Sequence, residues 1–322
     1  MRAALLLVVE RLRSGGRAFA ADARHGQIAV LASLLVFGRF ALDFDISLAQ
    51  IAFTLGGALA FQWAATRLWR LPSFEPRSAL ISGLSLCLLL RTDAPWLALA
   101  AAAIAVFSKF LIRVRGKHLF NPTNLALVAM VLVTGGSWAR PGAVWISPGQ
   151  WGSTTVFAAV LGCAGITVAH RAARSDVAFA FLAGWLCVLF GRAAWLGQPW
   201  SVPVHQLESG ALVLFTFFMI SDPRTTPDAR PMRIAFGLAA ALLAGVIQFV
   251  LFRASGPVWA LALLSPAVPL LDRLVPATRF EWTASFARTR SSHLGPLHET
   301  PAPAGSTAHD RALALARTHG RP

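Results

Sequence analysis

The feature that most constrains this chain is a series of long apolar blocks separated by short polar connections. Most blocks are roughly 15 to 22 residues long, the length that a helix needs to cross the hydrocarbon core of a bilayer. Hydrophobic residues make up 56% of the 322-residue sequence and charged residues only 13%. An average soluble domain carries roughly a quarter charged residues. The chain is therefore expected to be an all-α, polytopic membrane protein whose main partner is the lipid bilayer.

Ten apolar blocks can be separated along the chain, and each predicts one transmembrane helix. They cover residues 28–42, 47–68, 78–91, 95–113, 121–136, 154–171, 177–194, 205–221, 233–253 and 257–275. Residues 1–26 precede them as a basic segment, expected to lie in the membrane interface because arginines directly follow its short apolar run. Residues 277–322 follow them and are rich in Pro, Ser, Thr, Arg and His, a composition typical of a disordered tail.

The basic residues that set the net charge of +15 are concentrated in alternate connections. Arginines gather after the second, fourth, sixth and eighth blocks, whereas the first connection carries only Asp43 and Asp45. By the positive-inside rule, basic connections lie on the cytoplasmic side, so they should alternate along the chain with connections poor in basic residues. With an even number of spans, both termini then lie on the basic side. This alternation predicts that both termini lie in the cytoplasm, and the membrane is expected to be a bacterial-type inner membrane. The alternation also explains the positive charge without a nucleic-acid partner.

Two segments in corresponding places suggest an internal repeat. Ser82-Gly83 opens one short apolar stretch that closes at a polar break, 91–95, and Ser209-Gly210 opens another that closes at 222–227. With five spans in each half, the halves 27–136 and 154–276 must have opposite topology, joined by an extracytoplasmic loop at 137–153. Paired interrupted segments in inverted repeats point to a transport path between them. The alternative is that such Ser-Gly pairs and proline-containing loops occur in any polytopic protein.

Two polar clusters stand at the ends of predicted helices. Asn121 can cap the helix that Pro122 begins, and Asn124 then lies one turn further inside. Asp222 stands at the cytoplasmic end of a span, where an ionisable group either anchors the helix end or marks an ion path. The predicted lining of a path consists of Ser82, Gly83, Asn121, Asn124, Ser209, Gly210, Asp222 and Thr225.

Several of these segments together resemble the NqrB/RnfD family, the large membrane subunits of the sodium-pumping NADH:quinone reductase and of the Rnf electron-transport complex. The segments that carry the likeness are 78–84, 121–124, 217–225, 233–237 and 266–272. The resemblance implies a ten-helix inverted repeat similar to urea and ammonium channels. It also implies a role in electron-transport-linked translocation of an ion or solute, with other membrane or redox subunits as partners.

The resemblance further implies a covalent flavin mononucleotide, attached in the family to a Thr in a Ser/Thr-Gly-Ala-Thr type of sequence. Here Thr134-Gly135-Gly136-Ser137 lacks the Ala-Thr ending, and Ser209-Gly210-Ala211 continues with a leucine. We therefore expect no covalent flavin, with Ser137 as a weak candidate and a noncovalent flavin (FMN or riboflavin) left open. Asn124 and the stretch 147–152 are separated by fewer residues than the long extracytoplasmic connection that carries the flavin in the family. In this shortened connection the chain is similar to RnfD-like proteins from some biosynthetic gene clusters.

Three functions remain open at this point: a subunit of an electron-transport-linked translocation system, a stand-alone channel or transporter for a small solute, and a scaffold that keeps only the fold. A soluble type of enzyme is not expected, because the sequence holds no nucleophile–base pair and no phosphate-binding glycine loop. Cys87, Cys163 and Cys187 are single residues within apolar blocks, so neither a disulfide nor a metal site is expected.

Overall fold

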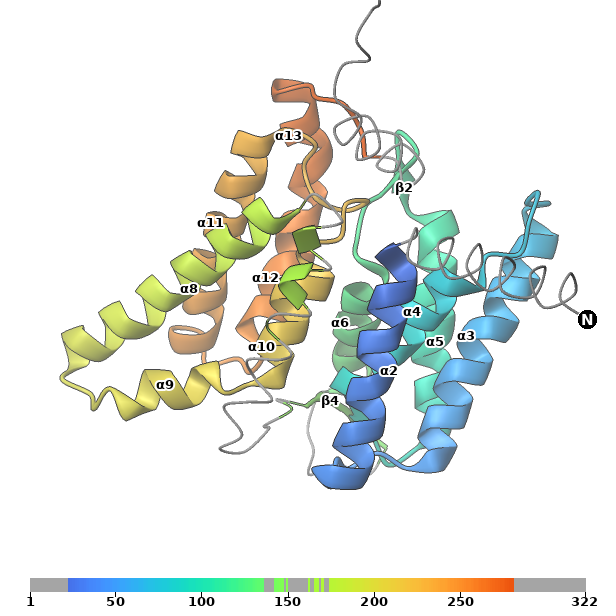
Figure 1. Ribbon diagram of the computed structural model, residues 1–322, viewed down its shortest axis with the longest axis horizontal. Coiled ribbons are helices and arrows are strands. Elements are labelled where there is room, and N and C mark those ends of the chain that lie inside the picture. The colour runs from blue at the N-terminus through green and yellow to red at the C-terminus, as the bar shows by residue number, and fades with distance from the viewer. Residues whose placement is uncertain are drawn as a thin grey trace, which may run out of the picture. The chain divides into compact units, whose positions relative to one another are not determined.

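The computed structural model describes residues 23–135, 142–147, 149, 162, 165–167, 169–170 and 174–280 (Figure 1). The predictions for most of the basic segment 1–26, for most of the helix 154–171 and for nearly all of the tail 277–322 lie outside these residues. So does most of the loop 137–153.

Helices dominate the described part of the chain. The first half contains α2 (Ala23–Ala41), α3 (Leu48–Leu68), α4 (Pro76–Leu89), α5 (Pro95–Leu111) and α6 (Pro122–Thr134). The second half contains α8 (Ser175–Leu196), α9 (Ser201–Leu207), α10 (Gly210–Leu214), the π-helical turn η1 (Phe215–Met219), α11 (Arg230–Phe249), α12 (Gly256–Leu264), the 3-10 turn η2 (Ser265–Ala267) and α13 (Val268–Leu274). Outside 154–171, every predicted span thus contains helix.

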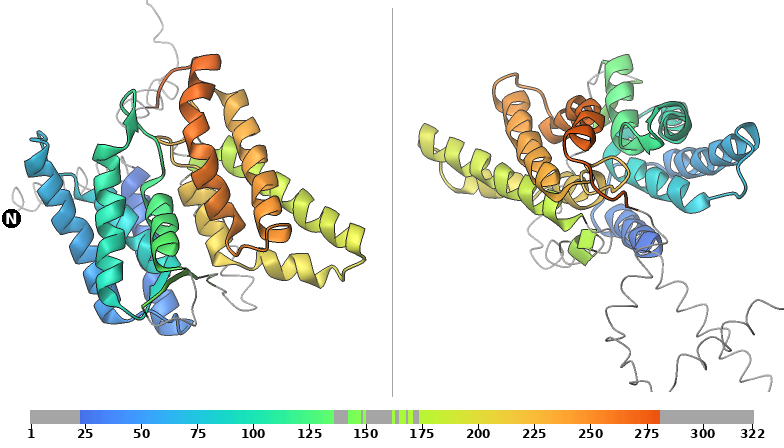
Figure 2. Two further views of the ribbon diagram at one scale, coloured as in Figure 1. Left: turned by 180° about the vertical axis from the view of Figure 1, so that it is seen from behind. Right: turned by 90° about the horizontal axis from the view of Figure 1, so that it is seen from above.

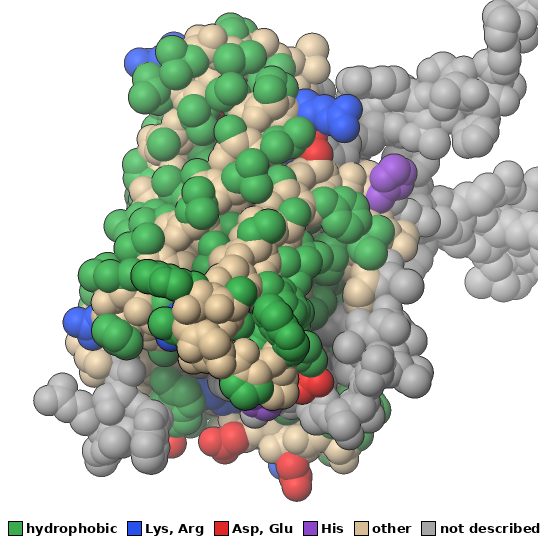
Figure 3. Space-filling model, turned by 90° about the vertical axis from the view of Figure 1, so that its left-hand side faces the viewer, with side chains coloured by type: hydrophobic (Ala, Val, Ile, Leu, Met, Phe, Trp, Pro, Cys, Tyr) green, Lys and Arg blue, Asp and Glu red, His purple; other side chains and the backbone are tan. Residues whose placement is uncertain are grey.

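Length and composition identify these helices as those of a membrane protein. By these criteria α3, α8, α11 and the continuous stretch Gly256–Leu274 can each cross a bilayer, and four shorter apolar segments accompany them. Large apolar side chains such as Val133, Trp195 and Phe252 are mostly exposed. Hydrophobic side chains also dominate the face shown in Figure 3. Surfaces this apolar are unusual for soluble monomers and suit contact with lipid.

The two halves use the same packing pattern. In the first half α3 packs along α5, and α5 packs against α6. In the second half α8 packs along α11, and α11 packs against α12. The two groups of helices are visible in both views of Figure 2, and α6 contacts α12 between them. This correspondence fits a repeat of five spans, while the inverted orientation and the total of ten spans stay predictions.

Small residues let the helices approach closely at two crossings. A Cβ atom added to Gly237 on α11 would lie only 2.7 Å from the carbonyl oxygen of Val177 on α8. A Cβ atom on Gly256 would likewise collide with the carbonyl oxygen of Ala244 on α11. Contacts of this kind stabilise helix pairs in membranes, where the hydrophobic effect contributes little to helix association.

The third helix of each half is short. Helix α4 has 14 residues, which reach about 21 Å, less than the roughly 30 Å of a bilayer core. It continues as strand β1 (Leu90–Thr92), which pairs antiparallel with β4 (Val144–Ile146). In the second half, α10 and η1 together form the short segment Gly210–Met219. Ser209 begins α10 as the sequence predicted, whereas Ser82 and Gly83 lie inside α4, which begins at Pro76.

The structure differs from the sequence predictions in three local features. The block 205–221 is not one helix, because α9 ends at Leu207 and Ser209 starts α10 by accepting a hydrogen bond from Leu212 N. Pro266 lies in the 3-10 turn that interrupts the last block. The all-α prediction also missed the short strand pairs, β1 with β4 and β2 (Arg113–Val114) with β3 (Lys117–His118).

Candidate functional site

The start of α6 lies where the two halves meet. Asn121 has an extended backbone, and its Oδ1 accepts a hydrogen bond from Asn124 N at 3.1 Å. Pro122 occupies the first turn, where a missing N–H costs nothing. This is the cap that the sequence predicted. Because Oδ1 makes the cap, the Nδ2 group of Asn121 is available to the second half.

That Nδ2 group reaches the break after η1. It donates to the carbonyl oxygen of Met219 and to Oδ2 of Asp222, each at 3.4 Å. In a continuing helix the Met219 carbonyl would accept from the residue four positions on, but that residue is Pro223, which has no N–H. The Met219 carbonyl instead accepts from Asp222 N at 3.3 Å, and Asn121 Nδ2 is a second donor to the same oxygen. We call Asn121, Asn124, Met219 and Asp222 the polar seam.

Asn124 extends the polar seam toward the last helix. Its side chain is fully buried, and Nδ2 donates to the carbonyl oxygen of Val258, in the first turn of α12, at 2.9 Å. Its Oδ1 has no hydrogen-bond partner among the described residues. Buried polar atoms are nearly always paired with protein or water. An open acceptor at this position is therefore suited to a water molecule or a passing ion.

Asp222 organises the break itself. Its Oδ1 accepts from Arg224 N at 3.0 Å, and its carbonyl oxygen accepts from the backbone N–H groups of Thr225 and Thr226. Burial raises the pKa of the Asp222 carboxyl, opposed by the hydrogen bond from Arg224 N.

The remaining predicted residues lie in other surroundings. Ser82 bonds to the carbonyl oxygen of Ser78 in its own helix, and Gly83 packs against Leu55 of α3. Ser209 caps α10, while Gly210 N donates to the carbonyl oxygen of residue 149. None of these contacts involves the polar seam. The structure brings together Asn121, Asn124, Asp222 and Thr225.

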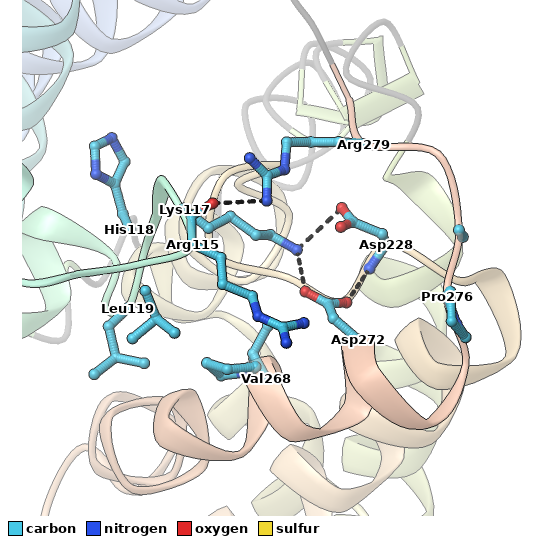
Figure 4. A pocket seen from close by; sticks show the side chains of 12 residues that line it. Arg115, Lys117, His118, Leu119, Asp228, Val268, Asp272, Pro276 and Arg279 are labelled. Carbon is cyan, nitrogen blue, oxygen red and sulfur yellow. Dashed lines mark hydrogen bonds and ion pairs between the residues drawn. The ribbon is translucent and has the colours of Figure 1, made fainter.

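A second polar cluster joins the halves at the end of the bundle that carries β2 and α13 (Figure 4). Lys117 Nζ lies 2.7 Å from Asp272 Oδ2, 3.0 Å from Asp228 Oδ1 and 2.6 Å from the carbonyl oxygen of Thr226. We call these four residues the Lys117 cluster. In the sequence, Lys117 counted only as a topology-determining charge. Its acidic partners lie more than a hundred positions away, so no local pattern reveals them.

Two further arginines hold the segment that leads from Asp222 to α11. Arg233 binds both carboxylate oxygens of Asp176, at 2.9 and 2.8 Å from Nε and at 2.6 Å from Nη2. Arg174 donates from Nε to Thr226 Oγ1 at 3.1 Å. Burial, followed by the nearby Arg233, lowers the pKa of Arg174 to about 10, so it stays charged at neutral pH. The position of Asp222 is thus fixed from the second half.

Basic side chains approach the same segment from the first half. The His118 ring is buried, and its Nε2 lies 3.4 Å from Arg224 Nη1. Burial and the charge of Arg224 lower the pKa of His118 to about 3, so the ring is neutral under physiological conditions. On α5, the buried Lys109 donates to Ser78 Oγ at 3.2 Å. Arg224, Arg174 and Lys109 thus place positive charge near the Asp222 carboxyl.

A cavity of about 240 Å³ lies beside the Lys117 cluster. It is bounded by the β2–β3 hairpin and by α13 with the residues that follow it. Pockets for drug-sized ligands occupy roughly 300–1,000 Å³, so this cavity is too small for a flavin. Among the described residues, no group of three or more His, Cys, Asp or Glu could hold a metal.

The region where a covalent flavin would attach is partly described. Thr134 Oγ1 donates to the carbonyl oxygen of Met130 at 2.8 Å and accepts from Val144 N at 3.0 Å. Its hydroxyl thus ties α6 to β4. Ser137, the weak candidate, lies outside the described residues.

Comparisons with known proteins identify relatives of this chain. A family model described as the NQR2, RnfD, RnfE family matches residues 138–281. An Escherichia coli K12 protein, named as a subunit of the ion-translocating oxidoreductase complex, is 27% identical over 144 residues, which are 44% of this chain and 36% of that protein. A protein of the same name from Ectopseudomonas mendocina is 27% identical over 297 residues, 76% of this chain and 85% of that protein.

The match to the Escherichia coli protein thus covers only about a third of its length, whereas the match to the Ectopseudomonas protein covers most of both chains. The range matched by the family model contains the segments 217–225, 233–237 and 266–272, on which the resemblance in the sequence rested. The comparisons thus support the resemblance to the NQR2, RnfD, RnfE family, with the family model matching a little under half of this chain.

Proposed function

We propose that this chain is the membrane subunit of an electron-transport-linked complex that translocates an ion or small solute. The observation that carries the proposal is the contact between Asn121 and Asp222. It joins the start of α6 in the first half to the break after η1 in the second half. In this role the chain provides a path and has no catalytic chemistry of its own.

The proposed path follows the inverted repeat. In this arrangement ten spans form two halves of opposite topology, both termini are cytoplasmic, and the membrane is a bacterial-type inner membrane. Interrupted helices whose ends meet inside the protein supply polar groups at membrane depth without exposing them to lipid. The open Oδ1 of Asn124 and the ionisable Asp222 are the groups that would contact the cargo.

The names of the relatives support a redox-linked role. Both are named as subunits of an ion-translocating oxidoreductase complex, which implies that other subunits accompany them. We propose that this chain likewise works with membrane or redox partners. We also propose that it lacks covalent flavin, because its sequence has no Ser/Thr-Gly-Ala-Thr attachment site.

The second proposal is a stand-alone channel or transporter for a small solute. It is favoured by the same absence of an attachment sequence, which removes the most direct link to electron transfer. A scaffold without activity is the third possibility. It is disfavoured by the buried, incompletely paired amide of Asn124, which a purely structural helix contact does not need.

Purification of the tagged full chain from its native membranes tests the proposed function. We expect flavin- or iron–sulfur-containing subunits to co-purify in a mild detergent, and the chain itself to show no flavin fluorescence after denaturing electrophoresis. Fluorescence of the denatured chain would overturn the absence of covalent flavin. A chain that purifies without redox partners, yet takes up solutes after reconstitution, would replace the first proposal by the second.

A further inference from the structure

The cavity beside the Lys117 cluster has features that the proposed path does not use. It is lined by basic, acidic and apolar residues from the β2–β3 hairpin, from Asp228 just before α11, and from α13 with the residues that follow it. In Figure 4 the side chains of Arg115 and Arg279 both point toward the space between the hairpin and α13.

The β2–β3 hairpin presents Arg115 by a tight turn. Arg113 pairs with His118 and Val114 with Lys117, which leaves Arg115 and Gly116 as the two turn residues. Both have positive φ angles, 53° for Arg115 and 78° for Gly116. A type I′ turn requires positive φ at both of its central residues, and glycine is favoured at the second of them. Arg279 Nη2 donates to the carbonyl oxygen of Arg115 at 2.9 Å, so the two arginines are fixed relative to one another.

The charges in the cavity are not balanced. Both carboxylates that line it, Asp228 and Asp272, are ion-paired with Lys117, and Asp272 Oδ1 also accepts from Asp228 N at 2.7 Å. Neither Arg115 nor Arg279 has an ion pair among the described residues, and both are exposed. Two guanidinium groups are therefore available to an anion that enters from outside. The planar, forked geometry of guanidinium suits the oxygens of a phosphate group.

The surroundings of the cavity suggest where such a phosphate would come from. On α13, next to the cavity residues Val268 and Pro269, Leu270 is 57% exposed and Leu274 is 67% exposed. Side chains this apolar are expected to face acyl chains, while the cavity lies at the end of the bundle with the basic connections. Basic pockets between transmembrane helices on the cytoplasmic side bind acidic headgroups in membrane proteins.

We propose that this cavity is a binding site for a phosphate group, carried by the headgroup of an acidic phospholipid and held by Arg115 and Arg279. The site goes beyond the proposed function, because none of its binding groups belongs to the polar seam. Lys117 has a separate role here, since it neutralises the two carboxylates that would otherwise repel the phosphate.

Ligand-dependent thermal stabilisation of the full chain, purified in an uncharged detergent, tests this proposal. One arm adds phosphatidylglycerol, with phosphatidylcholine as the neutral comparison. The other adds inorganic phosphate, with chloride at matched ionic strength. The variant is the double substitution Arg115→Gln and Arg279→Gln. The matched control is Arg67→Gln and Arg70→Gln, which removes two exposed charges at the predicted cytoplasmic side and away from the cavity.

We expect phosphatidylglycerol to stabilise the wild type and the control, and the double Gln variant to need about tenfold or more of the lipid for the same shift. A double Lys variant keeps the charge and should respond more strongly than the Gln variant. If phosphatidylglycerol or inorganic phosphate stabilises the wild type, and this stabilisation needs the two arginines, the phosphate site is supported. The ligand that stabilises the protein then identifies what carries the phosphate group.

The proposal is wrong if the double Gln variant and the control respond alike, or if neither ligand stabilises the wild type. If the Gln variant does not fold, the test moves to the wild type, where inorganic phosphate at high concentration must compete with phosphatidylglycerol. Equal stabilisation of the wild type by phosphatidylglycerol and phosphatidylcholine would also contradict it.

Discussion

Replacing Asp222 by Asn should reduce redox-driven ion uptake by at least about tenfold while leaving the fold intact. The two side chains have nearly the same shape, and the Asn oxygen can still accept the hydrogen bond from Arg224 N. What is lost is the negative charge that faces Asn121 Nδ2 in the polar seam. A path for a cation or a proton needs such a group between its two halves.

The measurement is uptake of radioactive sodium, and of protons by a pH-sensitive dye, into inside-out membrane vesicles energised by an electron donor. The matched control is Asp93→Asn, which removes the same charge from an exposed position after β1. Wild-type uptake of both ions by the Asp222→Asn variant would exclude Asp222 from the path. Reduced uptake by both variants alike would indicate an effect of net charge alone.

Replacing Lys117 by Met should destabilise the protein by about 3–5 kcal/mol, the usual cost of removing one partner of a buried ion pair. The Lys117 side chain is 9% exposed, and those of Asp228 and Asp272 are 8% and 16% exposed. Methionine keeps the length and the apolar stem of lysine but leaves two buried carboxylates close together without their ammonium group. The contact between the hairpin and α13 would be the first to weaken.

Thermal and denaturant unfolding in detergent measures this effect. The comparison is Arg77→Met, which removes a basic group from a salt bridge to Glu75, whose side chain is 42% exposed, and should cost no more than about 1 kcal/mol. Adding Asp228→Asn and Asp272→Asn to the Lys117 variant should restore part of the stability. Equal stability of the Lys117 and Arg77 variants would mean that the Lys117 cluster does not hold the halves together.

The positions of the helices could be predicted from the sequence because the bilayer imposes their length and composition. The block 47–68 became α3 (Leu48–Leu68) almost to the residue, and Asn121-Pro122 began α6 as its capping pattern predicts. The β2–β3 hairpin was missed because its turn residues, Arg115 and Gly116, are not one of the strongly favoured hairpin dipeptides such as Asn-Gly or Asp-Gly.

The contacts between the halves could not be predicted from local rules. Lys117 and Asp272 are 155 positions apart, and Asn124 and Val258 are 134 positions apart. Pairs of this kind depend on how helices pack in three dimensions, which periodicity does not encode. For the same reason, Ser82-Gly83 was predicted to line a path, whereas its contacts in the structure are with its own helix and with Leu55.

The polar seam is a path across the membrane only if the two halves have inverted orientations. The breaks after α4 and η1 must then lie on opposite sides of the membrane. Single cysteines at Asp93 and Arg224, in a chain without Cys87, Cys163 and Cys187, test this arrangement with a membrane-impermeant maleimide. In intact spheroplasts we expect labelling of the cysteine at position 93 and not of the one at 224, with the reverse in inside-out vesicles. Labelling of both cysteines from the same side would contradict the inverted repeat.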